Sequence, residues 1–187
     1  MIPSLSEITA TGRKAAKGAG YSWGLADEAG RATAWLWDHG IDSISALADL
    51  LDHGDPDTCP IYIGTRLCDA PFNRAITFET VQSPILLLSF AAELGKITQN
   101  TIQLTIGTGT YFATAEAMYC DTPCMDGPVA MLRHKDAPMG DRLTPVDRRA
   151  APAEAWARLG TWEHKTYAPA TEASRLAGAG AGLSDND

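Results

Sequence analysis

Apolar residues recur at helical spacing over the first third of the chain. This pattern predicts three helices, at residues 4–17, 22–40 and 42–54, separated by short connections. In the second of them, Leu25, Ala29, Ala32 and Leu36 share one face, and a face of this kind is normally buried. We therefore expect the three helices to form a compact N-terminal layer.

The middle of the chain changes to shorter apolar runs, which are bounded by turn residues and in part alternate with polar residues. Such runs are typical of β-strands. In chain order we predict strands at Ile61–Ile63, Ile76–Thr80, Ile85–Phe90, Ile102–Ile106, Thr110–Ala117 and Val129–Leu132. The run Ile85–Phe90 is almost wholly apolar, which suits a central strand covered on both faces. Because no helix is expected between these strands, the sheet should be mainly antiparallel.

An apolar stripe at helical spacing returns near the C-terminus. Trp156, Leu159 and Trp162 mark one helix, and a second short helix is expected after Pro169. The predicted fold class is α+β, with residues 1–54 helical, 55–135 sheet-rich and 144–187 helical with a tail. Since the sequence has no internal repeat and no long linker, residues 1–187 should form a single domain.

The composition is that of an acidic globular protein. Of 187 residues, 23 are acidic and 15 basic, which gives a net charge of −8. General nucleic-acid binding is excluded because it needs cations that neutralise phosphates, and an acidic surface disfavours docking on anionic membranes. The longest apolar stretch, Ile85–Ala92, is far shorter than the ~20 residues of a membrane-spanning helix. With no secretory signal pattern at the N-terminus, we expect a cytoplasmic protein.

Several motifs that carry chemistry in other proteins are incomplete in this chain. The segment Gly107–Gly109 begins like a dinucleotide fingerprint, but it lies between two predicted strands and lacks the third glycine. The acidic loop Asp52–Cys59 does not have the ligand spacing of a calcium loop. The spacings of the four cysteines do not match a zinc knuckle. We therefore expect no metal, no cofactor and reduced thiols, although a zinc site assembled in space and a Cys120–Cys124 disulfide remain alternatives.

Two segments are unusual for a purely structural role. The first, residues 18–32, contains Trp23 at a predicted helix start and two helical glycines, Gly24 and Gly30. An aromatic ring beside free backbone N–H groups suits a small anion or a planar ligand, whereas close packing of helices would equally explain the glycines. The second segment, residues 171–187, alternates glycine with alanine and ends in acidic residues. A solvated terminus is its simplest interpretation.

Both segments resemble motifs of a bacterial family of unknown function. The motifs are WGLADEAGRA at residues 23–32 and SRLAGAGAGLSDND at residues 174–187. The resemblance implies that the two ends of the chain are hallmarks of the family. It implies no activity and assigns no catalytic residue.

Two hypotheses for function follow. In the first, the two chain ends form a pocket that binds or turns over a small metabolite, for instance one that bears a carboxylate. The ligand-binding candidates are Trp23, Arg31, Ser174 and Arg175, and the candidates for acid–base chemistry are Glu28, Asp185 and Asp187. In the second, the protein is a non-catalytic accessory subunit or a homodimer whose C-terminal tail docks in its partner. The sequence leaves open whether the protein is an enzyme.

Overall fold

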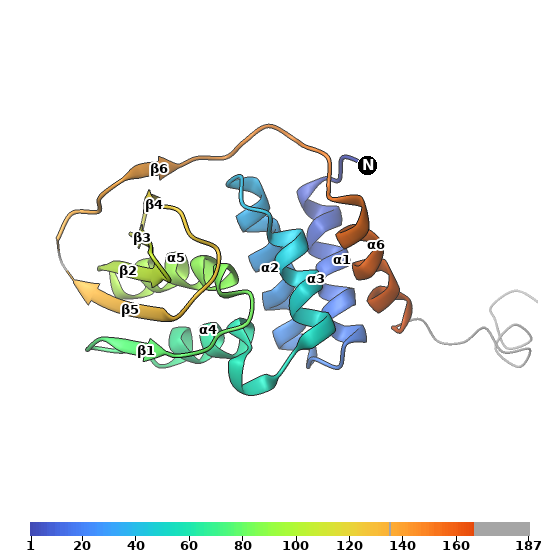
Figure 1. Ribbon diagram of the computed structural model, residues 1–187, viewed down its shortest axis with the longest axis horizontal. Coiled ribbons are helices and arrows are strands. Elements are labelled where there is room, and N and C mark those ends of the chain that lie inside the picture. Colours follow the sequence, from blue (N-terminus) through green and yellow to red (C-terminus); the bar gives the residue numbers. More distant parts are fainter. Residues whose placement is uncertain (135, 167–187) are drawn as a thin grey trace, which may run out of the picture.

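Three capped helices form the N-terminal layer of the protein. The computed structural model describes residues 1–134 and 136–166 (Figure 1). Helix α1 (Leu5–Gly18) begins after Ser4, which forms a capping box with Glu7. Helices α2 (Trp23–Asp38) and α3 (Ser43–His53) begin after Ser22 and Asp42, whose side chains accept hydrogen bonds from backbone amides in the first turn. The three predicted helices are confirmed.

Helices α1 and α2 approach each other closely at Gly30. A Cβ atom at this position would lie 2.5 Å from the carbonyl oxygen of Thr9 and 3.0 Å from the backbone nitrogen of Arg13. Gly24, in the first turn of α2, has no atom within 4 Å of the corresponding position. Close helix packing therefore accounts for one of the two glycines and not for the other.

Helix α6 (Ala153–His164) completes this layer by packing against α1 and α3 (Figure 1). Asp52 at the end of α3 accepts hydrogen bonds from Trp162 Nε1 at 2.6 Å and from Arg158 Nε at 2.7 Å. The indole hydrogen bond, followed by the hydrogen bond from Arg158, holds the pKa of the Asp52 carboxyl below its usual value. On the other side, Lys14 donates to Glu163 at 2.8 Å. The predicted helix with its tryptophan stripe is confirmed.

Arg149 joins the segment before α6 to the end of α2. Its guanidinium stacks on Trp37 at 3.9 Å and donates to the carbonyl oxygens of Gly40 at 2.7 Å and Ile41 at 2.9 Å. A weaker contact reaches the carbonyl of Trp37 at 3.4 Å. Carbonyl groups at a helix end have no partner within the helix, so this one side chain satisfies backbone groups of α2 and of the turn that follows it.

Within residues 1–134 and 136–166 the sheet has six strands, and every pair of neighbours is antiparallel. The strands are β1 (Ile76–Phe78), β2 (Thr101–Ile106), β3 (Gly109–Ala113), β4 (Met118–Thr122), β5 (Val129–His134) and β6 (Asp141–Leu143), and their order across the sheet is β1-β5-β2-β3-β4-β6. The two central strands are thus β2 and β3. The predicted strands at Ile76, Ile102 and Val129 are confirmed. The predicted strand Thr110–Ala117 ends at Ala113, because Thr114 closes a turn to Ala117: its Oγ1 accepts from Ala117 N at 3.1 Å and its backbone N–H donates to Ala117 O at 2.8 Å.

Two apolar runs that we predicted as strands are helices instead. Ile61–Ile63 lies in α4 (Pro60–Asp69), which begins with a proline at the favoured first position. Ile85–Phe90 forms a 3₁₀ turn (Pro84–Leu86) and the start of α5 (Leu87–Thr98). Both predictions were wrong because a short run of apolar residues suits a buried strand and a buried helix equally. The predicted sheet-rich segment, 55–135, therefore also contains two helices.

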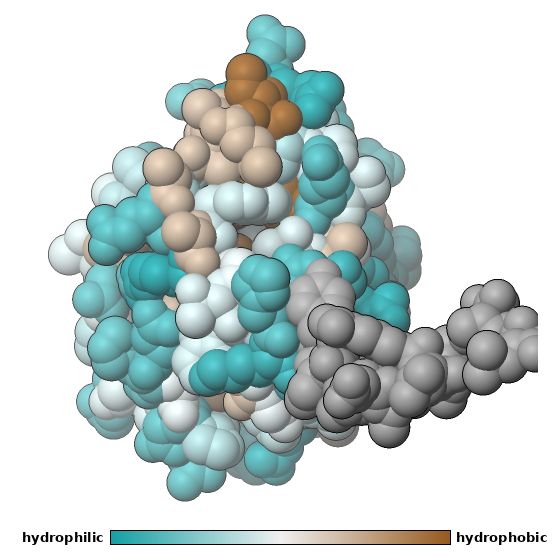
Figure 2. All heavy atoms as spheres, turned by 90° about the vertical axis from the view of Figure 1, so that its right-hand side faces the viewer, coloured by the Kyte–Doolittle hydropathy of each residue, from teal (hydrophilic) through white to brown (hydrophobic). Residues whose placement is uncertain are grey.

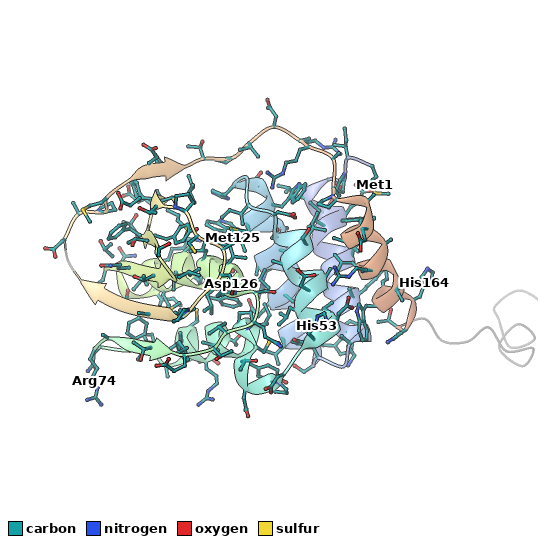
Figure 3. All side chains as sticks on the ribbon, viewed as in Figure 1. Met1, His53, Arg74, Met125, Asp126 and His164 are labelled. Atoms are coloured by element: carbon teal, nitrogen blue, oxygen red, sulfur yellow. The ribbon has the colours of Figure 1, made fainter. Side chains whose placement is uncertain are left out.

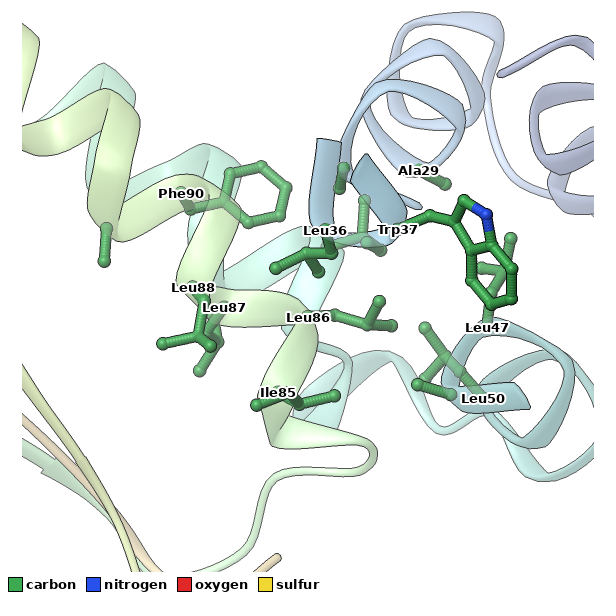
Figure 4. Packing of buried hydrophobic residues seen from close by; sticks show 14 of the residues in the cluster. Ala29, Leu36, Trp37, Leu47, Leu50, Ile85, Leu86, Leu87, Leu88 and Phe90 are labelled. Atoms are coloured by element: carbon green, nitrogen blue, oxygen red, sulfur yellow. The ribbon is translucent and has the colours of Figure 1, made fainter. Parts of the chain in front are cut away.

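The first half of helix α5 is apolar on nearly all sides because it is enclosed. Leu87, Leu88 and Leu94 have no exposed surface, and Figure 4 shows the run from Ile85 to Phe90 extending its side chains toward Leu36 of α2 and Leu50 of α3 as well as to the other side. The opposite side of α5 covers β2 and β3. One hydrophobic core therefore connects the helical layer to the sheet, and the fold is a single α+β domain, as predicted.

The surface of the helical layer is mostly hydrophilic, as Figure 2 shows for the face that includes the end of α6. Apolar side chains gather toward the top of this view. Exposed apolar residues occur near the N-terminus and in the segment after β6, namely Met1, Ile2, Leu5 and Val146. None of the helices in the described part of the chain is long and apolar enough to span a bilayer.

Candidate functional site

A cavity with a volume of about 620 Å³ lies among helices α1, α2, α4 and α5. We call it the helical cavity. Its apolar wall contains Ala32, Trp35, Phe90, Ala92 and Ile97. A volume of this size is typical of small-molecule sites, which are largely apolar with a few polar groups that orient the ligand.

The packing of α4 against α5 gives the cavity one of its walls. A Cβ atom at Gly64 of α4 would lie 2.2 Å from Cγ of Phe90, so glycine is needed for this close approach. The phenyl ring is thereby held between the two helices with only 5% of its surface exposed. Cys68, one turn after Gly64, donates its thiol hydrogen to the Phe90 carbonyl at 3.8 Å between sulfur and oxygen.

Five charged side chains line the helical cavity: Glu28, Arg31, Asp69, Glu93 and Lys96. Arg31 pairs with Glu28 along α2, and Lys96 pairs with Glu93 along α5 at 3.4 Å. Pairs three residues apart on a helix contribute only ~0.2–0.5 kcal/mol each. The two cations can therefore exchange or share these contacts with a ligand at little cost.

Three hydroxyl groups also line the cavity, and each donates its hydrogen to its own helix. Thr9 donates to Leu5 O at 2.9 Å, Thr65 to Ile61 O at 2.8 Å and Ser89 to Leu86 O at 3.0 Å. A hydroxyl group has one hydrogen to donate and two lone pairs to accept with. These three oxygens can therefore only accept hydrogen bonds from a ligand.

The thiol of Cys68 is unsuited to nucleophilic chemistry. Burial, and then the negative charges of Glu93, Glu28 and Asp69, raise its pKa to about 12. The thiolate is the nucleophilic form, so almost all of this group is neutral near pH 7.

The predicted site residues fall into three groups. Glu28 and Arg31 both line the helical cavity and form an ion pair with each other. Trp23 lies in the first turn of the same helix but does not line the cavity; it is 53% exposed. The remaining candidates, Ser174, Arg175, Asp185 and Asp187, lie outside the described residues, so their roles stay predictions.

Trp23 lies instead beside two cations of α1. Arg13 is 5.2 Å and Lys17 is 5.3 Å from the centre of the indole ring. Both cations have further partners, because Arg13 pairs with Asp27 at 2.9 Å and Lys17 donates to Tyr21 O at 3.2 Å. The ring therefore packs with its own neighbours on the surface.

Sequence reasoning missed the half of the helical cavity that α4 and α5 supply. Glu93 and Lys96 are three residues apart, which is a signal of a shared helix face, but it is visible only once the preceding run Ile85–Phe90 is assigned to a helix. Nothing in the sequence indicates that α5 packs beside α2.

The four cysteines and the acidic loop Asp52–Cys59 are the places where the sequence left a metal site or a disulfide open. All four cysteines are free thiols. Within residues 1–134 and 136–166, no three His, Cys, Asp or Glu side chains are grouped so that they could hold a metal ion. In the acidic loop, Asp52 is engaged by Arg158 and Trp162, and Asp55 caps a 3₁₀ turn (Pro56–Thr58) by accepting from Asp57 N at 3.0 Å.

Comparison with known families covers the first part of the chain. Residues 3–79 match a family described as protein of unknown function (DUF3726). This match contains the motif at residues 23–32 and three of the four helices around the helical cavity, α1, α2 and α4. The predicted resemblance to a family of unknown function is thereby confirmed, whereas the C-terminal motif lies beyond the matched residues. The search of curated proteins and the search of solved structures gave no significant match.

Proposed function

We propose that this protein binds a small zwitterionic carboxylate, of the α-amino-acid class, in the helical cavity. The observation that carries the proposal is the separation of hydrogen-bonding roles within the cavity. Arg31 and Lys96 donate, whereas the three hydroxyl oxygens and Asp69 accept. A ligand that has both a carboxylate and an ammonium group satisfies both sets.

Arg31 would bind the carboxylate of the ligand. Its side chain is 65% exposed, and its contact with Glu28 uses Nη2, so further N–H groups of the planar guanidinium can donate to two carboxylate oxygens at once. The ammonium group would lie toward Asp69, which forms no ion pair with a described residue, and toward the hydroxyl oxygens. Trp35 and Phe90 would cover the apolar part of the ligand.

Turnover through a cysteine nucleophile is disfavoured by the state of the Cys68 thiol at the cavity. Because the pKa of Cys68 is raised to about 12, the thiol stays protonated near neutral pH. The proposal is therefore a ligand-binding protein. It includes location in the cytoplasm, since four free thiols suit a reducing compartment.

Isothermal titration calorimetry with single α-amino acids tests this function. Leucine or methionine should bind, whereas the matching amine without the carboxylate and the matching acid without the amine should each bind about tenfold more weakly or worse. Arg31→Gln should weaken binding of the amino acid by a similar factor. Arg66→Gln is the matched control, because Arg66 is an exposed arginine of α4 that does not line the cavity. If no α-amino acid binds, or if Arg31→Gln leaves the affinity unchanged, the proposal is wrong.

The alternative, an accessory or homodimeric subunit whose tail docks in a partner, stays a prediction because the tail lies outside the described residues. Size-exclusion chromatography with light scattering tests it. A dimer of the full chain that becomes a monomer when residues 167–187 are deleted would support this alternative.

A further inference from the structure

A second, smaller cavity adjoins the helical cavity. Its volume is about 210 Å³, and Trp35, Ala92 and Lys96 line both cavities. We call it the distal cavity. Its other walls come from the end of α2, the turn between β3 and β4, and the segment at β6.

The distal cavity is lined by more positive than negative charge. Lys96 and Arg142 line it, and the acidic residue of its lining is Glu116. Arg142, on the edge strand β6, is exposed and forms no ion pair with any described residue. An arginine without a carboxylate partner in the fold can donate two parallel hydrogen bonds to the carboxylate of a ligand.

His39 adds a further polar group to the same cavity. Its ring stacks on Trp35 with 4.1 Å between ring centres, and its Nδ1 lies 2.8 Å from the carbonyl oxygen of Trp35. Since a carbonyl oxygen can only accept, Nδ1 carries the hydrogen of this bond. The ring is thus held in place, and Nε2 is the nitrogen left for a ligand.

We infer that the ligand is an α-amino acid with a second carboxylate at the end of its side chain. This inference rests on the proposed function: the α-carboxylate and ammonium occupy the helical cavity, and the side chain passes Ala92 into the distal cavity. There its carboxylate binds between Lys96 and Arg142. The distal cavity, which is about a third of the volume of the first, fits the end of a side chain better than a separate ligand.

A homologous series tests the inference. Aspartate, glutamate, 2-aminoadipate and 2-aminopimelate extend the second carboxylate step by step, and asparagine, glutamine and norleucine are neutral counterparts. In calorimetric titrations, affinity should rise with length to a best member that binds about tenfold more tightly than a neutral amino acid of similar length. Salt should weaken this advantage, because it depends on exposed charges.

Arg142→Gln should remove the tenfold advantage and leave the affinity for norleucine unchanged. Arg74→Gln is the matched control, because Arg74 is an exposed arginine near β1 that lines neither cavity (Figure 3). If norleucine binds through Arg31 but the second carboxylate gives no gain at any length, the inference is overturned and the proposed function stands. The same holds if Arg142→Gln leaves the gain intact. If neither norleucine nor any dicarboxylic member binds, both fail.

Discussion

Replacing the two glycines of α2 by alanine, one at a time, is expected to change stability in opposite directions. Gly30→Ala would place a Cβ atom 2.5 Å from the Thr9 carbonyl oxygen, whereas Gly24→Ala would add a methyl group with no atom within 4 Å. Carbon and oxygen atoms normally approach no closer than ~3.3 Å even in weak hydrogen bonds. Helix α1 must therefore move away by nearly 1 Å to admit the methyl group at Gly30.

The two effects can be estimated from general energetics. Overpacking costs ~1–3 kcal/mol, and the upper end applies at Gly30 because a backbone atom cannot move aside as a side chain can. Alanine recovers ~1 kcal/mol of helix propensity, which leaves a net loss of ~2 kcal/mol. At Gly24, in the first turn, only a gain of ~0.5 kcal/mol is expected. For a domain of this size these changes correspond to a Tm ~4–8 °C lower and ~1–2 °C higher, respectively.

Thermal unfolding followed by circular dichroism, with urea unfolding followed by tryptophan fluorescence, measures both variants. Gly24→Ala is the matched control, because the same substitution is made in the same helix. Since α1 supplies Thr9 to the helical cavity, Gly30→Ala should also weaken ligand binding. A Gly30→Ala protein as stable as the unmodified chain would refute the close approach of α1 and α2, and a less stable Gly24→Ala protein would refute the open position of Gly24.

Three further predictions concern pH, thiol reactivity and a helix end. The folded-state pKa of Asp52 is lowered, chiefly by the hydrogen bond from Trp162. The ionised carboxylate therefore stabilises the fold above the ordinary carboxyl pKa of 3.8, and this stabilisation is lost as pH falls through the folded-state pKa. Asp52→Asn should be less stable to urea than the unmodified chain at pH 7, and this difference in stability should shrink below pH ~4. Iodoacetamide at pH 7 should label Cys124 before Cys68, as followed by peptide mass spectrometry. Backbone hydrogen bonds lower the pKa of the Cys124 thiol, whereas burial raises the pKa of the Cys68 thiol to about 12. Equal labelling rates would contradict this order. Arg149→Ala should lower the free energy of unfolding by ~2–4 kcal/mol, since a charged donor to three carbonyl oxygens is lost. Arg149→Lys should recover only part of this free energy. A loss below ~0.5 kcal/mol in Arg149→Ala would show that the stacked guanidinium contributes little.

The two mispredicted segments show what short apolar runs leave undecided. Ile61–Ile63 and Ile85–Phe90 are too short for their period to separate strand from helix. Their conformation depends on what surrounds them. The first half of α5 is buried against α2, α4 and the sheet, and the 3₁₀ turn before it contacts α3. The run Ile85–Phe90 therefore has too few polar positions for a helical period to be read from it. By contrast, the run Ile102–Ile106 was predicted correctly because one of its faces is less buried and carries Gln103 and Thr105.

The candidate site was predictable only in part. Glu28 and Arg31 belong to a motif that the sequence singles out, and both line the helical cavity. All the acceptors except Thr9, and the second cation, come from α4 and α5, which follow about 30 to 70 residues later in the chain. Their proximity to α2 is produced by burial of apolar surface, including the contact of Phe90 with Gly64, and no local pattern encodes it.

The sequence by itself determined the acidic character of the protein, the four helices of the helical layer, and the strands β1, β2, β3 and β5 of the sheet. These features depend on interactions within a few residues: periodic burial of one face, serine and aspartate caps, and turn residues. Only the tertiary structure decided that two apolar runs are helices and that Glu28, Cys68 and Lys96 surround one cavity. The physical reason is that hydrophobic burial is not directional and is satisfied by whichever elements meet in space, so it is decided over the whole chain at once.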